Sequence, residues 1–298
     1  MTQFVLGIDF GSTTGKAVIL DSNGNMVAAE VSQKGAVSDE SVRVALGAAL
    51  RHAGLQLDQI ARTVSTGYGR RMVEMADRTV TEISCHARGA AHLIPGVKLV
   101  IDIGGQDSKV IALDDDGLVV RFAMNDRCAG GTGKYFETLA RALNVGIDEM
   151  GPMALKATLD MQVTSMCATF AETEVIALLA EGATKIEVLG GVHAAMAKRT
   201  LGLISRVGKR DPVAMTGGVA RNPAAVHHIE KALETRLILP EQPQIAGALG
   251  AALFALDDLR DQAVATPLPK AIPMDDNDLH GVEEIEGSSA PACKSKAN

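Results

Sequence analysis

Two acidic residues, Asp9 and Asp102, occupy matching places in a segment that occurs twice in the chain. Residues 6–27 and 99–120 align without a gap at a constant offset. Further pairs match at the same offset: Gly11 with Gly104, Lys16 with Lys109, and the turn at 21–24 with the turn at 114–117. Each copy reads as an apolar strand, a glycine-containing turn, a second strand and an Asp/Gly turn, which is the pattern of a β-hairpin. Two such hairpins facing each other across a cleft would present two carboxylates to one ligand.

The glycine-containing turns of the two copies are candidate phosphate sites, because backbone amides in such turns form an anion-binding concavity. Glycine lets the backbone approach a phosphate without a Cβ in the way. The predicted phosphate-binding residues are Gly11, Ser12 and Thr13 in the first copy, and Gly104 and Gly105 in the second. A polyphosphate with a divalent metal fits both the turns and the carboxylates.

The acidic residues of the repeat have predicted roles around that metal. Asp9 and Asp102 would hold Mg²⁺ through water, because Mg²⁺ keeps much of its hydration shell. Gln106 or Asp107 could orient the water that attacks the terminal phosphate. The alternative is that the paired carboxylates only cap their turns. The two lysines on the outgoing strands, Lys16 and Lys109, are expected to face solvent or to form ion pairs rather than to act in catalysis.

Two of the four cysteines stand just ahead of predicted helices. Cys128 lies in Asn-Asp-Arg-Cys-Ala-Gly-Gly-Thr-Gly, and Cys167 lies in Ser-Met-Cys-Ala-Thr-Phe-Ala-Glu. The positive end of a helix dipole lowers a thiol pKa and would stabilise a thiolate-ligated cluster. Two thiolates are too few for a four-iron cluster, which takes four, so a similar subunit across a two-fold or pseudo-two-fold axis would supply the others. The alternative is that both are buried thiols.

Three other residues carry weaker signals. Cys85 stands next to His86, where buried or outer-shell packing is favoured over metal ligation. Cys293 lies in the acidic C-terminal stretch and is expected to be a free, exposed thiol. His193 follows two glycines near the start of a predicted helix, and we expect it to hydrogen-bond to a neighbouring turn.

Length and charge exclude several functional classes. With 298 residues, the chain is long enough for two domains. The formal net charge of −7 argues against nucleic acid and against an anionic membrane as partners. No apolar run is long enough to span a bilayer, and the N-terminus lacks a basic-then-apolar signal. These features predict a cytoplasmic protein, in which disulfides between the four cysteines are not expected.

Strands and helices alternate around the two hairpins, which predicts two α/β halves. Helices are predicted near 42–55, 81–94, 135–143, 169–180, 186–207, 227–235 and 247–259, with a further helix ending near 76. Additional strands are predicted near 60–66, 161–165, 213–216 and 237–239. The expected first subdomain comprises 1–97 plus 246–262, and the second, 98–245, carries the cluster cysteines. Residues 263–298 are expected to form a largely disordered acidic tail.

This order of elements resembles the actin, Hsp70 and sugar-kinase ATPase superfamily over residues 1–262. The resemblance rests on two phosphate signatures and an adenosine signature: Ile8-Asp9-Phe-Gly11-Ser12-Thr13, Ile101-Asp102-Ile-Gly104-Gly105-Gln106-Asp107 and Met215-Thr216-Gly217-Gly218. It implies an α/β fold of two duplicated ribonuclease-H-like domains with the nucleotide, ATP, in the cleft between them. Gly217 and Gly218 would then let the chain pass flat against the adenine and ribose.

The contexts of Cys128 and Cys167 resemble a narrower family: the ATP-dependent activators of 2-hydroxyacyl-CoA dehydratases and the ATPase subunits of benzoyl-CoA reductases. The stretches 65–70 and 82–87 look like this family as well. The resemblance implies that the two cysteines hold one [4Fe–4S] cluster between two ATPase subunits, identical or homologous. It also implies a reduced ferredoxin donor and catalytic partner subunits that bind an acyl-CoA and carry iron–sulfur centres.

Within that family we expect an ATPase subunit of a benzoyl-CoA reductase, which reduces the aromatic ring to a cyclic diene. The alternative is an activator of a 2-hydroxyacyl-CoA dehydratase. The acidic tail, longer than a free-standing activator needs, favours the reductase subunit, although it could equally be an inert extension. Gly130 departs mildly from the family pattern, where alanine is expected.

A small-molecule kinase on the same fold is the main alternative of another class. The phosphate and adenosine signatures fit a kinase equally well. A kinase needs a general base aimed at the substrate hydroxyl, and none is identified outside the hairpins. It also has no use for cysteines at two helix starts. A regulatory or chaperone ATPase is disfavoured because no separate peptide-binding domain is present.

Overall fold

The computed structural model describes residues 3–32, 39–164 and 167–264. These residues form two five-stranded sheets with the same topology, in the orders β3-β2-β1-β4-β5 and β8-β7-β6-β9-β10. The first sheet contains β1 (Phe4–Phe10), β2 (Gly15–Asp21), β3 (Met26–Ser32), β4 (Ile60–Thr66) and β5 (Arg78–Thr79). The second contains β6 (Leu99–Ile103), β7 (Ser108–Leu113), β8 (Val119–Asn125), β9 (Val213–Thr216) and β10 (Leu237–Ile238). The predicted two-domain α/β architecture is confirmed.

The two hairpins of the sequence repeat have the same register. In β1 and β2, which are antiparallel, Asp9 is opposite Lys16. In β6 and β7, also antiparallel, Asp102 is opposite Lys109. A parallel strand, β4 or β9, then pairs with the first strand of each hairpin. The duplicated sequence therefore builds duplicated local structure, including the position of the carboxylate at the end of the first strand.

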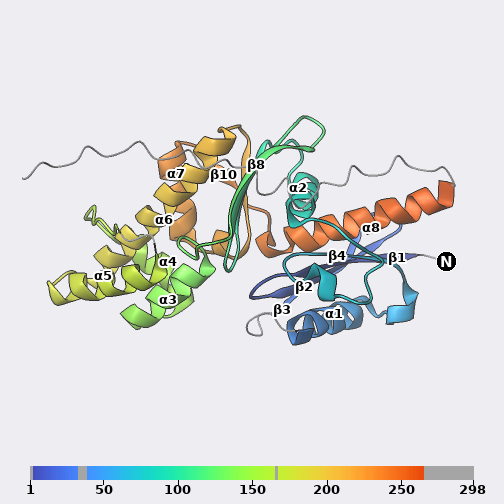
Figure 1. Ribbon diagram of the computed structural model, residues 1–298, viewed down its shortest axis with the longest axis horizontal. Helices are drawn as coiled ribbons and strands as arrows, with labels where there is room; N and C mark the ends of the chain where they lie inside the picture. Colours follow the sequence, from blue (N-terminus) through green and yellow to red (C-terminus); the bar gives the residue numbers. More distant parts are fainter. Residues whose placement is uncertain (1–2, 33–38, 165–166, 265–298) are drawn as a thin grey trace, which may run out of the picture.

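Helices α1 (Asp39–Ala53) and α8 (Ala246–Val264) cover opposite faces of the first sheet (Figure 1). Neighbouring residues of β1 point to opposite faces, as the strand geometry requires. Val5 packs into the cluster that contains the side chains of α8, whereas Leu6 and Ile8 pack with those of α1. The last described helix of the chain therefore returns to the sheet formed by its first residues.

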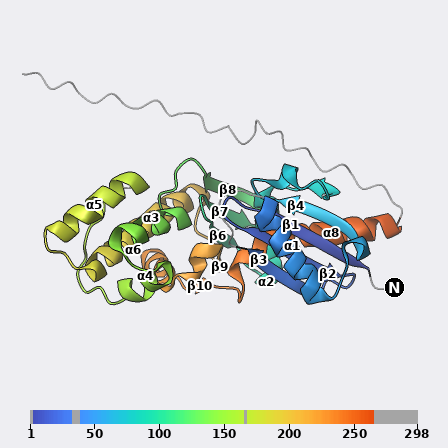
Figure 2. The ribbon, with the colours of Figure 1, turned by 90° about the horizontal axis from the view of Figure 1, so that it is seen from below.

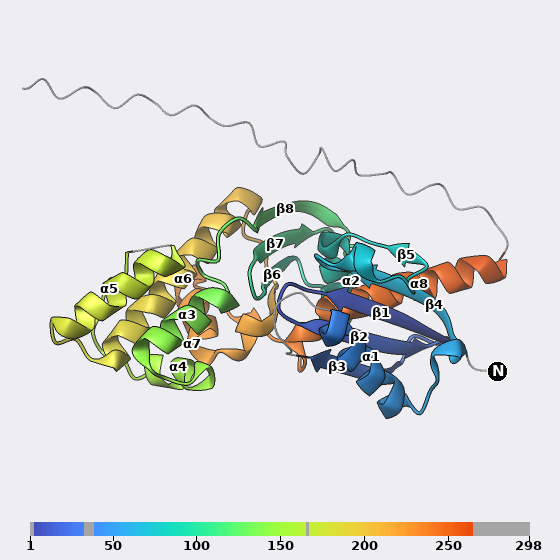
Figure 3. The same cartoon turned by 60° about the horizontal axis from the view of Figure 1, so that its bottom comes forward.

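Helix α2 (Glu82–Leu93) lies between α8 and the second sheet, as the orange and teal helices of Figure 3 show. Its side chains Ile83, Ala87 and Ala90 pack with residues of β6 and β7. On the other side, α2 and α8 touch backbone to backbone, because a Cβ on Gly89 would lie 1.9 Å from the carbonyl oxygen of Ala246. Glycine is therefore required where these helices cross, and α2 is fixed between the two halves.

The second sheet carries a larger set of helices, which extend to the far end of the molecule (Figure 2). They are α3 (Gly133–Leu143), α4 (Ile147–Ala154), α5 (Ala168–Ala180), α6 (Lys185–Val207) and α7 (Pro223–Leu233). They share one apolar core with the second sheet, in which Phe136, Val175, Val188 and Ile229 are buried. Short 3₁₀ helices complete the described chain: η1 (Leu57–Gln59), η2 (Arg70–Met72), η3 (Gly218–Arg221) and η4 (Pro243–Ile245).

Some local predictions were wrong. The helix expected before 76 is only the short η2, and residues 161–164 form no strand. Helix α5 begins at Ala168, one residue before the predicted start, with Cys167 as its N-cap. Helix α8 runs to Val264, past the predicted start of the tail at 263. The rest of that tail, with Cys293, lies outside the described residues.

No helix in the described ranges combines the length and apolar character that crossing a bilayer requires.

Candidate functional site

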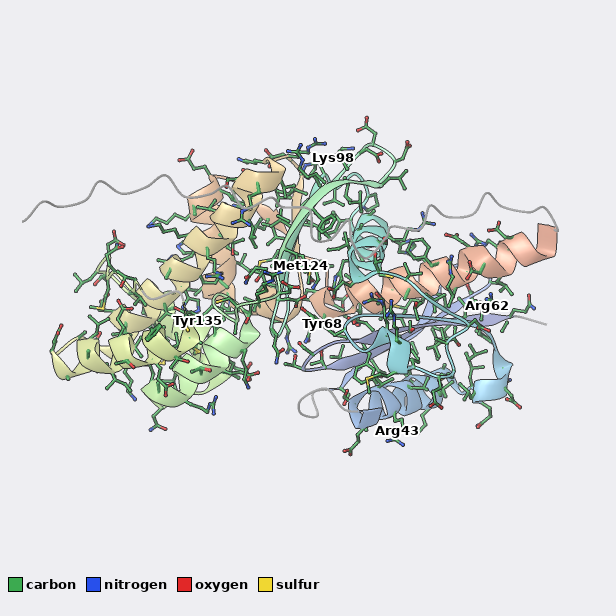
Figure 4. All side chains as sticks on the ribbon, in the orientation of Figure 1. Arg43, Arg62, Tyr68, Lys98, Met124 and Tyr135 are labelled. Carbon is green, nitrogen blue, oxygen red and sulfur yellow. The ribbon has the colours of Figure 1, made fainter. Side chains whose placement is uncertain are left out.

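A cavity of about 970 Å³ lies between the two halves and is lined by the turns of both hairpins. Most of the predicted nucleotide-site residues line it: Asp9, Gly11, Ser12, Thr13, Gly104, Gly105, Gln106, Asp107, Gly217 and Gly218. Tyr68, which follows β4, also lines it, and Figure 4 shows this residue where the two halves meet. The exception among the predicted carboxylates is Asp102, which is 2% exposed and lies beneath the cavity surface.

The two glycine-containing turns touch each other at one end of the cavity. A Cβ on Gly105 would lie 2.2 Å from the Thr13 hydroxyl oxygen, so only glycine allows this approach. Gly11 N donates to Thr14 O at 3.1 Å, and Gly104 N donates to Asp107 O at 2.9 Å, which closes both turns in the same way. This end of the cavity thus has backbone amides from both halves, the arrangement that suits a phosphate chain.

Asp9 is held by Lys16, whose Nζ lies 2.9 Å from Asp9 Oδ2. A Cβ placed on Gly247 would be 3.0 Å from both Asp9 Oδ2 and His86 Nε2. The first residues of α8 thus pass directly beside the carboxylate and the imidazole. Glycine at 247 leaves room for both groups in the floor of the cavity.

Asp102 has polar neighbours from three elements. Thr216 Oγ1 on β9 donates to its Oδ1 at 2.8 Å. His86 Nδ1 on α2 lies 3.2 Å from the same oxygen, close enough for an ion pair although its N–H is not aligned for a hydrogen bond. Burial alone would raise the pKa of Asp102, but the charges of His86 and Lys109 hold this pKa well below its ordinary value. Asp102 is therefore a buried carboxylate anion rather than a simple turn cap.

Lys109 lies between three carboxylates. Its Nζ contacts Asp107 closely, and it lies 3.5 Å from Glu82 Oε2 and 3.6 Å from Asp102 Oδ2. Burial disfavours an ammonium group, but the charges of Asp102 and Glu82 outweigh it, so the pKa of Lys109 lies above its ordinary value. The ion-pair prediction for Lys16 and Lys109 is confirmed, and the solvent-facing alternative is wrong for Lys109.

His86 and Glu82 also line the cavity, although neither was predicted as a site residue from the sequence. Burial raises the pKa of Glu82, and Asp102 raises the pKa of His86 against the opposing effect of burial. Both belong to α2 and are spaced four residues apart, so they lie on one face of a helix. That spacing was visible in the sequence, but nothing in it indicated that this face meets the second hairpin.

The opposite end of the cavity is lined by η3, η4 and α4. Gly217 has φ +84°, and a Cβ there would lie 2.3 Å from Ile103 O, so the turn after β9 requires glycine. Asn222 Oδ1 accepts the amides of Ala224 and Ala225 and caps α7, while its Nδ2 contacts His193 Nε2 at 3.0 Å. The predicted structural role of His193 is confirmed, since its Nδ1 also lies 2.7 Å from Leu189 O.

The predicted cluster cysteines lie outside this cavity. Cys167 is exposed, and the backbone amides of Thr169 and Phe170 lower its thiol pKa. Cys128 lies ahead of α3 as expected, but Thr132 rather than the cysteine is the N-cap. Its sulfur accepts the amide of Gly130 at 3.4 Å. Helices α3 and α5 pack against each other, so both thiols precede helices of one unit.

The remaining described cysteine does not fit a metal site. Cys85 is fully buried, and burial raises its thiol pKa to about 12. Among the residues that the structure describes, no group of three or more His, Cys, Asp or Glu side chains could hold a metal ion.

Known proteins match this chain over most of its length, in sequence and in fold. The model of the BadF/BadG/BcrA/BcrD ATPase family matches residues 6–255. The chain belongs to this ATPase family. It is 46% identical to the activator of lactoyl-CoA dehydratase from Anaerotignum propionicum, over 86% of this chain and 98% of that protein. It also matches the solved activator of the 2-hydroxyisocaproyl-CoA dehydratase from Clostridium difficile with bound ADPNP. That match has a TM-score of 0.84 and 38% identity, and covers 90% of this chain and 100% of the other.

Similarity to a benzoyl-CoA reductase is weaker. One subunit of the benzoyl-CoA reductase from Thauera aromatica is 33% identical over 69% of this chain and 74% of its own length. The comparisons thus favour the alternative raised from the sequence, a dehydratase activator, over the reductase subunit that was preferred. The acidic tail, the feature that favoured the reductase subunit, is not part of the matched region.

Proposed function

We propose that this chain is the ATP-hydrolysing activator of a 2-hydroxyacyl-CoA dehydratase, and that it passes low-potential electrons to that enzyme. The observation that carries the proposal is the combination of the cavity, lined by both phosphate turns, with two cysteines ahead of packed helices. Similarity that spans 98% and 100% of the lengths of two dehydratase activators supports it. A benzoyl-CoA reductase subunit remains a less supported member of the same class.

The residues around the cavity fit ATP with Mg²⁺. The amides of the two turns would bind the phosphates, and Asp9 would hold Mg²⁺ through water from the cavity surface. Asp102 lies beneath the cavity surface, so its proposed role is to hold His86 and Lys109 in place under the phosphates. Because Lys109 contacts the Asp107 carboxylate, Gln106 is the freer of the two predicted groups for orienting the attacking water.

The cysteines fit one half of a [4Fe–4S] site. Cys128 already accepts an amide hydrogen bond at sulfur, and the amides at the start of α5 favour the Cys167 thiolate. A four-iron cluster takes four thiolates, so a second copy of the chain would supply the other pair. Helix α5 carries two large exposed apolar side chains, Phe170 at 69% and Ile176 at 51%, which a second copy would cover.

The electrons would come from a reduced ferredoxin-type donor and go to an iron–sulfur centre on the dehydratase component. When bound, the cluster supplies one-electron storage at a potential that depends on charge, hydrogen bonds and solvent exposure. Hydrolysis of ATP would make the transfer one-way, because release of the γ-phosphate would reset the protein and prevent electrons from flowing back.

The test is reactivation of an inactive 2-hydroxyacyl-CoA dehydratase component under strictly anaerobic conditions, with a low-potential donor and ATP. We expect dehydration only when the chain, ATP and donor are all present. Cys128→Ala should abolish reactivation while keeping nucleotide binding, whereas Cys85→Ala, the matched control at a buried thiol, should keep both. Reduction of benzoyl-CoA with the reductase components, but no dehydratase reactivation, would assign the chain to the reductase instead.

A further inference from the structure

The start of α3 is hydrogen-bonded to the second phosphate turn. Gly133 N donates to Gly104 O at 2.9 Å, and Lys134 N donates to Gly105 O at 2.7 Å. The first amides of a helix have no acceptor within the helix, so the carbonyls of the turn satisfy them. The contact is close, since a Cβ on Gly133 would lie 3.3 Å from Gly104 O. The helix start and the turn therefore form one unit.

These two bonds also orient the amides of the turn. In a trans peptide the C=O and N–H groups point in opposite directions. Because Gly104 and Gly105 direct their carbonyls at α3, the amides of Gly105 and Gln106 point away from it. No hydrogen bond within the described part of the chain uses either amide, and both residues line the cavity. They are thus donors available to a phosphate, held in place by α3.

The same helix start is tied to Cys128 through a compact turn. Thr132 N donates to Ala129 O at 3.0 Å, and Thr132 Oγ1 donates to the same oxygen at 2.6 Å. Gly130 N donates to the Cys128 sulfur at 3.4 Å. Residues 128–132 therefore connect Cys128, a candidate cluster ligand, to the start of α3, which is hydrogen-bonded to the second phosphate turn.

The other side of Cys128 is fixed to a different part of the fold. Asn125 Nδ2, at the end of β8, donates to Cys128 O at 2.7 Å. Arg199 on α6 donates to Asn125 Oδ1 at 3.3 Å. One end of the 128–132 turn is thus attached to β8, at the edge of the second sheet, and the other end is attached to the second phosphate turn. A displacement of the phosphate turn relative to β8 would therefore change the geometry of residues 128–132, next to the Cys128 sulfur.

We propose that the first turn of α3 is a positioning element that couples anion binding at Gly105 and Gln106 to the environment of the Cys128 sulfur. The inference rests on the proposed function, in that the anion is a phosphate group of ATP. A phosphate on these amides polarises their peptide units and strengthens the bonds from Gly133 and Lys134. Coupling between two sites acts in both directions, so a group attached to Cys128 should change nucleotide affinity.

The experiment uses full-length, iron-free protein and measures the rate at which iodoacetamide alkylates Cys128, followed by peptide mass spectrometry. In the wild type, a non-hydrolysable ATP analogue with Mg²⁺ should change this rate by about 5-fold or more. Gly133→Pro deletes the amide that donates to Gly104, and proline suits this first helical position after the extended Thr132 (φ −108°, ψ 177°). We expect this variant to lose most of the nucleotide effect.

Two alanine variants serve as controls. Gly133→Ala adds a Cβ but keeps the amide, so it should retain more of the effect than Gly133→Pro. Gly202→Ala makes the same change on α6, where nothing lies within 4 Å, and should retain all of it. Equal nucleotide effects in Gly133→Pro and Gly133→Ala would overturn the proposal.

A second measurement uses protein with no substitution at the start of α3. In Cys167→Ser protein, alkylation of Cys128 should change the affinity for the ATP analogue by about 5-fold or more, because coupling between two sites acts in both directions. An unchanged affinity would overturn the coupling, even if the protein assembles a cluster and activates a dehydratase. Conversely, coupling in a protein that never takes up iron would leave this inference intact and overturn the proposed function.

Discussion

Lys16 Nζ lies 2.9 Å from Asp9 Oδ2, directly across the first hairpin. Asp102 and Lys109 hold the same register position in the second hairpin, but there the distance is 3.6 Å, because Lys109 is shared with Asp107 and Glu82. The duplicated pair has thus diverged. In the first hairpin the lysine neutralises the carboxylate that faces the cavity, and in the second it belongs to a buried network.

Removing Lys16 should destabilise the protein in the absence of Mg²⁺. Lys16→Met leaves the Asp9 carboxylate, only 5% exposed, without this cation, and breaking such a pair costs about 3 kcal/mol. Mg²⁺ should restore part of the loss. Urea unfolding in EDTA and in Mg²⁺ measures both effects. The matched control is Lys134→Met, which breaks an exposed pair with Glu137 and should cost less than about 1 kcal/mol. Equal losses in the two variants would refute the argument.

Removing the Thr216 hydroxyl should impair ATP turnover more than nucleotide binding. Thr216→Val keeps the shape of the side chain but deletes the donor to Asp102 Oδ1. The carboxylate would then be less firmly oriented towards His86 and Lys109, and loss of such a supporting partner typically costs about 10- to 100-fold. Steady-state ATPase assays with a nucleotide-binding titration test this. Thr200→Val on α6, where the hydroxyl contacts Met196 O and Met196 Sδ rather than a cavity residue, should leave the turnover number unchanged.

His193 should make the protein sensitive to mild acid. Its Nδ1 must donate to the Leu189 carbonyl, so Nε2 accepts from Asn222 and the ring is neutral. Burial lowers the pKa of His193 to about 4, whereas the unfolded value is 6.5. The unfolded state therefore binds the proton first, and stability falls as the pH falls from about 6.5 towards 4. The full shift corresponds to about 3 kcal/mol.

Urea unfolding at several pH values measures this dependence. His193→Gln should flatten the slope between pH 6.5 and 4 relative to the wild type. If His193→Gln has the same slope as the wild type, His193 does not titrate as inferred.

Gly217 should tolerate no side chain. It has φ +84°, and a Cβ would lie 2.3 Å from Ile103 O, so Gly217→Ala forces the turn after β9 away from β6. We expect a loss of stability of about 1–3 kcal/mol and weaker nucleotide binding. Gly218→Ala is the matched control, because its nearest neighbour is the end of the Gln244 side chain at 3.5 Å. Thermal unfolding without nucleotide separates the two variants, and equal stabilities would contradict the prediction.

The parts of the site that the sequence predicted are those encoded locally. A repeat with Asp, Gly and Lys at fixed spacing determines a hairpin register, so Asp9 and Gly11 could be assigned from pattern alone. The neighbours of Asp102 could not, because His86 reaches it only after α8 returns to the first sheet and packs against α2. The burial of Asp102 and the hydrogen bonds from α3 to the second phosphate turn likewise depend on tertiary packing. Contacts of this kind produce no recognisable pattern of residue spacing in the sequence.

Native mass spectrometry of protein reconstituted with iron and sulfide under strict exclusion of oxygen tests the shared cluster most directly. The mass should equal two chains plus one [4Fe–4S] unit, which is about two iron atoms per chain. Cys128→Ala and Cys167→Ala should each remove the iron, and Cys85→Ala should keep it. A monomer that carries a complete cluster, or an iron-free protein that still reactivates a dehydratase, would contradict the proposal.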